Sequence, residues 1–150
     1  NITDSPPTAD ELSLKVNMNA ANGVLEFKTM QDYSNGTSVT YTDGLLVNST
    51  SNFQIKVRSL QDVLQSTSGN SIPVDVIHLP LVTASSANQQ ISPIVLGLAN
   101  QTLAKTNSNS KNNKTYSYDI KYFTLAQDLR LINAKSDNYS TTLQYEITPQ

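Results

Sequence analysis

Residues 11–18 read Glu11-Leu12-Ser13-Leu14-Lys15-Val16-Asn17-Met18, a strict alternation of polar and apolar side chains. Successive side chains of a β-strand point to opposite faces of a sheet, so a period of two separates an apolar face from a polar one. The sequence therefore predicts a half-buried strand over residues 11–18. Its apolar face carries Leu12, Leu14, Val16 and Met18.

The same alternation recurs along the chain, most clearly in Tyr116-Ser117-Tyr118-Asp119-Ile120-Lys121-Tyr122. Further segments of this kind lie at residues 25–30, 39–41, 45–47, 53–57, 72–76 and 139–147. Turn signals such as Asn35-Gly36, suited to a type I′ hairpin, and Asp43-Gly44 separate them. We expect an all-β fold, an antiparallel immunoglobulin-like β-sandwich of about eight or nine strands. A single helical turn is expected at residues 59–64.

The chain divides into two parts on composition. Residues 1–10 are polar around Pro6-Pro7, and we expect a flexible leader with a stiff proline spacer. Residues 11–150 are expected to form one sandwich domain, because a chain of 150 residues suits a single domain of ordinary size.

Composition indicates an extracellular, cell-surface protein. Asn, Ser and Thr fill a third of the chain, whereas only 10 residues are Lys or Arg and 12 are Asp or Glu. The absence of cysteine excludes disulfides and thiolate metal sites. A net charge of −2 without a basic cluster argues against nucleic acid as a partner. No apolar run approaches the ~20 residues of a membrane span.

No catalytic, metal-binding or cofactor-binding residue is predicted. His78 is the only histidine, so neither a histidine-based zinc site nor a histidine relay can form, and we expect it to be structural. Asp119 and Glu146 are the best candidates for the carboxylate pair of a glycosidase. We nevertheless expect the protein not to be an enzyme.

The tyrosines allow two interpretations. Tyr116, Tyr118 and Tyr122 share a face with Ile120, which favours a place in the core, with each hydroxyl reaching the sandwich edge. The alternative is an exposed aromatic platform that binds sugars. Tyr139 is a candidate tyrosine corner.

Six Asn-x-Ser/Thr sequons are candidate glycosylation sites if the source glycosylates such sequences. They begin at Asn1, Asn35, Asn48, Asn100, Asn113 and Asn138.

The last strand also carries a resemblance. Residues 137–148, which contain Tyr139-Ser140-Thr141-Thr142-Leu143-Gln144-Tyr145-Glu146-Ile147-Thr148, resemble the closing strand of secreted bacterial β-sandwich surface domains, including pilin-like filament subunits. Residues 25–27, 32–36, 46–50 and 53–57 look like Bacteroidetes-type surface proteins. The resemblance implies an extracellular immunoglobulin-like domain that belongs to a filament or surface layer.

Two functional hypotheses follow. In the first, the chain is a structural subunit of an extracellular filament or pilus-like assembly, and residues 11–18 pair with another copy by strand complementation. The same strand could instead pair within its own chain. In the second hypothesis the chain is a stand-alone carbohydrate-binding or adhesin module whose partners are host or cell-surface glycans.

Overall fold

The computed structural model describes residues 12–16, 35–83, 89–106, 114–135 and 137–150. The predicted leader at residues 1–10, the predicted strand at 25–30 and Met18 lie outside these residues. Within them the chain is built of antiparallel strands, so the all-β prediction is confirmed. The described residues form thirteen strands, more than the sequence indicated, because several of them are only two or three residues long.

The largest sheet has six strands, with the long strands β2 and β11 at its centre. Its strands are β1 (Leu12–Val16), β2 (Ser38–Ser49), β11 (Lys114–Phe123), β6 (His78–Leu79), β9 (Ile94–Val95) and β7 (Leu81–Val82). They follow the order β1-β2-β11-β6-β9, and β7 pairs with β11 beside β6.

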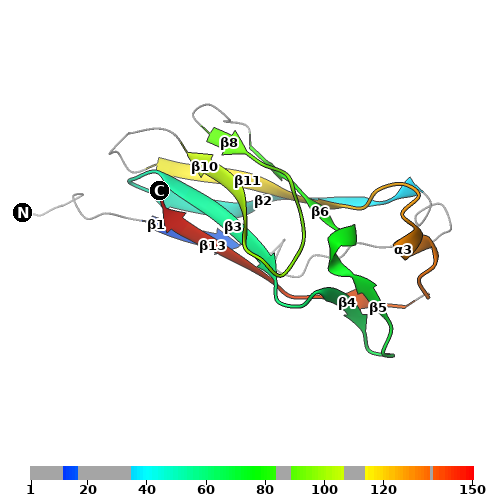
Figure 1. Ribbon diagram of the computed structural model, residues 1–150. Helices are drawn as coiled ribbons and strands as arrows, with labels where there is room; N and C mark the ends of the chain where they lie inside the picture. The colour runs from blue at the N-terminus through cyan, green and yellow to red at the C-terminus, as the bar shows by residue number, and fades with distance from the viewer. Residues whose placement is uncertain (1–11, 17–34, 84–88, 107–113, 136) are drawn as a thin grey trace, which may run out of the picture.

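Two segments of the chain run through both the second and the third sheet. The second runs in the order β13 (Leu143–Pro149), β3 (Phe53–Ser59), β10 (Gln101–Thr106) and β8 (Gln89–Ile91). The third contains β12 (Tyr139–Ser140), β4 (Val63–Ser66) and β5 (Ser71–Pro73). Because β3 leads into β4 and β12 leads into β13, both chain segments pass from one sheet to the other at the same place (Figure 1).

The core lies between the first and second sheets. Leu45 and Val47 of β2 are fully buried, as are Phe53, Ile55 and Val57 of β3. The ring of Phe53 packs edge-on against Tyr116 of β11, with 5.0 Å between the ring centroids. Two sheets that bury alternate residues against each other are consistent with a sandwich.

Asp43-Gly44 does not end a strand, as the sequence predicted, but forms a bulge inside β2. The register between β2 and β11 shifts between Tyr118 and Ile120, and Asp43 has a φ of 52°. A Cβ on Gly44 would lie 2.8 Å from the side chain of Ile120. The long pairing on both sides of the bulge keeps β2 continuous, whereas the Asp-Gly pair supplies the backbone freedom that a bulge needs.

Two other local predictions are wrong. Residues 59–64 form no helical turn, because Ser59 ends β3 and Val63 begins β4. Asn35-Gly36 forms no type I′ turn, since Gly36 has a φ of 79° but Asn35 does not have a positive φ. The helical elements whose full length is described are η1 (Val74–Val76) and α3 (Leu129–Ile132), where the Asp128 side chain accepts from the Arg130 amide.

Candidate functional site

Strand β1, the described part of the predicted pairing strand, lies at the edge of the largest sheet. It pairs with β2 of its own chain, with Leu12 opposite Ser49, Leu14 opposite Val47 and Val16 opposite Leu45. On its other side it lies near β13 of the second sheet, so that it covers one side of the sandwich (Figure 1). The structure therefore has the cis pairing that the sequence allowed as an alternative; pairing with another copy stays a prediction.

The apolar residues of β1 are only partly buried. Leu12 and Leu14 pack against the core but keep some exposure, and Val16 is 36% exposed. Their partners Leu45 and Val47 on β2 are fully buried. Strand β1 thus contributes less buried apolar area than its partner β2. Removal of β1 would expose part of the core to solvent.

The three tyrosines of β11 do not form an exposed platform. Tyr118 is fully buried, and Tyr116 and Tyr122 are partly buried against the core. The hydroxyls of Tyr122 and Tyr145 lie 2.6 Å apart and join β11 to β13, one strand from each sheet. The core interpretation of these tyrosines is confirmed.

Burial changes the acidity of this tyrosine pair. Desolvation is the main cause that raises the pKa of Tyr122 to about 12, against a smaller lowering by its hydrogen bond to Tyr145. Desolvation also raises the pKa of Tyr145 well above the ordinary value of 10.0. Both phenols therefore hold their protons in the folded chain at a pH where free tyrosine ionises.

Tyr139 has the geometry expected of a tyrosine corner. Its hydroxyl donates to the backbone carbonyl of Lys135, four residues earlier, at 2.6 Å. This bond ties the start of β12 to the segment that follows α3.

The two candidate carboxylates lie on opposite outer faces of the sandwich. Asp119 follows the buried Tyr118 on β11, whereas Glu146 follows Tyr145 on β13. Asp119 accepts from the backbone amide of Asp43, and Glu146 accepts from the Asn100 side chain. Separated by the core, they cannot act on one glycosidic bond.

His78 has structural contacts. Its ring stacks on Phe123, with 5.0 Å between the centroids and 18° between the planes. Among the described residues no group of three His, Asp or Glu side chains is arranged to hold a metal ion.

The sequons differ in accessibility. Asn35, Asn100 and Asn138 are exposed. Asn48 is partly buried on β2, where its side-chain oxygen accepts from the Thr115 hydroxyl at 2.7 Å. Asn1 and Asn113 lie outside the described residues, and glycosylation of any sequon remains a prediction.

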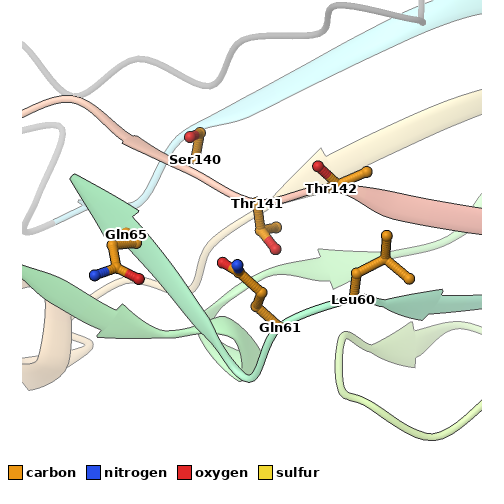
Figure 2. A pocket seen from close by; sticks show the side chains of 6 residues that line it. All are labelled: Leu60, Gln61, Gln65, Ser140, Thr141 and Thr142. Carbon is orange, nitrogen blue, oxygen red and sulfur yellow. The ribbon is translucent and has the colours of Figure 1, made fainter. Parts of the chain in front are cut away.

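A polar hollow that the sequence did not indicate lies where the chain passes between the second and third sheets (Figure 2). Its volume is about 390 Å³. Its lining residues come from the β3–β4 connection, the end of β4 and the β12–β13 junction: Leu60, Gln61, Gln65, Ser140, Thr141 and Thr142. Local pattern could not reveal it, because the two halves of the lining are more than seventy residues apart in sequence.

The comparisons with known proteins include a distant structural likeness. No protein-family model matches the chain, and no curated protein matches it. The crystal structure of the P pilus rod subunit PapA is similar, with a TM-score of 0.45 and 8% sequence identity over 91% of this chain and 99% of PapA. PapA belongs to the class of protein that the sequence resemblance implies, but a likeness this distant carries no argument about function. Among the described residues no helix is long and apolar enough to cross a membrane.

Proposed function

We propose that the chain is a structural subunit of an extracellular filament or pilus-like surface assembly, and that residues 11–18 of one copy complete the sheet of the next. The observation that carries the proposal is the position of β1, which among the described strands pairs with β2 alone and covers the side of the sandwich. The scarcity of charge and the absence of cysteine support a place outside the cell.

Exchange of β1 between copies would preserve its contacts. The same Leu12, Leu14 and Val16 would face the same Ser49, Val47 and Leu45, now on a neighbouring molecule. Swapping an identical element in this way costs little, because each contact broken in one chain is made again in another. When each copy gives its strand to the next, the interface is head-to-tail and generates an open chain of subunits.

The length of chain between β1 and β2 permits the exchange. Residues 17–37 separate Val16 from Ser38, and an extended chain advances about 3.3 Å per residue. These 21 residues set an upper limit of several tens of ångströms on the distance between β1 and β2, so chain length alone does not prevent β1 from reaching a neighbour while β2 stays in its own sheet.

The test compares two matched carboxylate variants of β1 by light scattering after size exclusion and by electron microscopy. Leu14→Asp places a charge on the face that packs against the core, whereas Ser13→Asp places it on the exposed face. We expect the parent chain and Ser13→Asp to form polymers and Leu14→Asp not to do so.

A truncated chain distinguishes exchange from simple unfolding. Deletion of residues 1–19 should abolish polymers, and a peptide of residues 10–19 should bind the truncated chain and raise its melting temperature. The same peptide with Leu14→Asp should do neither. A parent chain that stays monomeric at every concentration would exclude the filament and favour the stand-alone binding module.

A further inference from the structure

We propose that the polar hollow between the β3–β4 connection and the β12–β13 junction is a binding site for neutral saccharides. None of the lining residues belongs to β1 or β2, and ligand binding in the hollow would not depend on filament assembly. The proposal is carried by the fixed framework of the hollow, by exposed polar side chains that hydrogen-bond to no other described residue and by the absence of charge from the lining.

The framework comes from two strand pairs that separate at the hollow. Strand β13 pairs with β3 as far as Leu143 opposite Ser59, and the Leu60 amide then donates to the Thr142 carbonyl at 2.9 Å. Pairing resumes in the other sheet with Ser140 opposite Gln65. Between these points the two backbones lie apart, and a ladder of hydrogen bonds holds each end of the opening.

The Ser59 hydroxyl fixes both sides of the hollow. Ser59 is fully buried, and its hydroxyl lies 2.6 Å from the Gln61 carbonyl and 2.9 Å from the Thr141 hydroxyl. A serine hydroxyl has one proton, and a carbonyl can only accept, so Ser59 donates to Gln61. Thr141 must then donate to Ser59, which leaves the oxygen of Thr141 free to accept a hydrogen bond from a ligand.

Four other lining side chains are exposed to solvent, where a ligand could replace water as their hydrogen-bond partner. In the described structure, the side chains of Gln61, Gln65, Ser140 and Thr142 bond to no other residue. Figure 2 shows the Gln61 side chain and the Thr141 hydroxyl turned toward each other across the opening. The amides and hydroxyls both donate and accept, and Leu60 adds an apolar surface that is 45% exposed.

This combination suits the chemistry of a sugar. Each sugar hydroxyl donates and accepts, as the lining groups do, and the C–H face of the ring matches the exposed Leu60. A charged ligand would find no counter-charge among the lining residues. An extended peptide needs a long run of unpaired backbone, but only Thr141 and Thr142 lie between β12 and β13.

The size of the hollow and the residue types of its lining set the expected affinity for a saccharide. A volume of about 390 Å³ lies in the range of small-ligand sites, roughly 300–1,000 Å³. The hollow offers no aromatic ring for stacking, so we expect dissociation constants on the order of 1 mM.

The test is a titration of the isotope-labelled full chain with neutral saccharides, in which the NMR chemical shifts of the backbone amides are measured at each saccharide concentration. The probes are the methyl glycosides of glucose, galactose, mannose and N-acetylglucosamine, together with cellobiose and lactose. We expect saturable shifts at the lining residues with at least one probe. Gln61→Ala and Thr142→Val should each weaken binding about fivefold by loss of one hydrogen bond, whereas Gln144→Ala, exposed on β13 outside the lining, should not.

Three results would overturn the proposal. These are an absence of saturable shifts with every probe, shifts that persist unchanged in Gln61→Ala and Thr142→Val, and shifts at the hollow produced only by a neutral Gly/Ser/Thr peptide. Size exclusion of Gln61→Ala should match that of the parent chain, so failure here is distinguishable from failure of the filament proposal.

Discussion

Replacement of Tyr122 and replacement of Tyr145 with Phe should have strongly coupled effects on the free energy of unfolding, because the two hydroxyls hydrogen-bond to each other between the sheets. Replacing either residue with Phe removes one hydroxyl and leaves the other partly buried without its partner at 2.6 Å. An unsatisfied buried hydroxyl costs about 1–3 kcal/mol, and partial exposure favours the lower half of that range. Each single variant should therefore lose about 1–2 kcal/mol of unfolding free energy.

The double variant is the sharper part of this prediction. With both hydroxyls gone, no polar group is left unpaired, so Tyr122→Phe with Tyr145→Phe should lose no more than one single variant does. Urea unfolding at pH 8 measures the free energy of unfolding of the parent chain, the two single variants and the double variant. Losses that simply add would refute the reasoning, because they would mean that the two hydroxyls do not depend on each other.

The same pair predicts alkaline sensitivity. In the unfolded chain Tyr122 ionises near its ordinary pKa of 10.0, whereas in the folded chain desolvation raises this pKa to about 12. The folded chain keeps its proton between these values, so stability is complete below about pH 10 and falls as the pH rises toward 12. A difference of two pKa units corresponds to about 2.7 kcal/mol, which is the largest loss that Tyr122 alone can contribute.

Comparison of unfolding at pH 8 and pH 11 isolates this contribution. The parent chain should lose more stability over that interval than the double Phe variant, because the variant has no phenol at either position. Tyr139→Phe is the control, since it removes a phenol whose hydrogen bond lies in an exposed setting. Equal losses in the parent and double Phe chains would contradict the burial argument.

Two further predictions concern packing and backbone conformation. Gly36→Ala should destabilise the chain by more than Gly69→Ala in thermal unfolding. Both glycines have a positive φ, which costs an alanine about the same at either position. A Cβ at Gly36 would also lie 2.3 Å from the Thr124 carbonyl oxygen, whereas a Cβ at Gly69 would have no atom within 4 Å. A Gly36→Ala loss no larger than the ~1 kcal/mol expected for Gly69→Ala would show that this turn can move. Leu103→Ala removes a fully buried side chain and should cost about 2–5 kcal/mol, whereas Leu143→Ala, partly buried at the edge, should cost about half as much in urea unfolding. A reversed order would mean that the edge of the sandwich is better packed than its centre.

The sequence by itself determined the class of the fold and the position of several of its strands. Alternation at residues 11–18, 53–57 and 116–122 predicts strands that the structure has at Leu12–Val16, Phe53–Ser59 and Lys114–Phe123. It also predicted that Tyr118 faces the core. These features are local, because the period of two follows from the geometry of each strand alone.

Tertiary structure decided which strands pair and which conformation the segments between the predicted strands adopt. Asp43-Gly44 has the chemistry of a turn, but pairing of β2 with β11 on both sides makes it a bulge. Residues 59–64 have no strong local preference, and β4 forms there because β5 and β12 flank it. Pairing depends on partners far away in sequence, which local propensity does not specify.

The candidate sites divide in the same way. The alternating strand at residues 11–18 is visible in the sequence, but its place at a sheet edge, paired with β2, required the fold. The hollow is invisible in the sequence, because Gln61 and Thr141 look like ordinary polar surface residues until Ser59 brings them together. Side-chain periodicity is a property of neighbouring residues, whereas a site made by two distant segments exists only once the chain has folded.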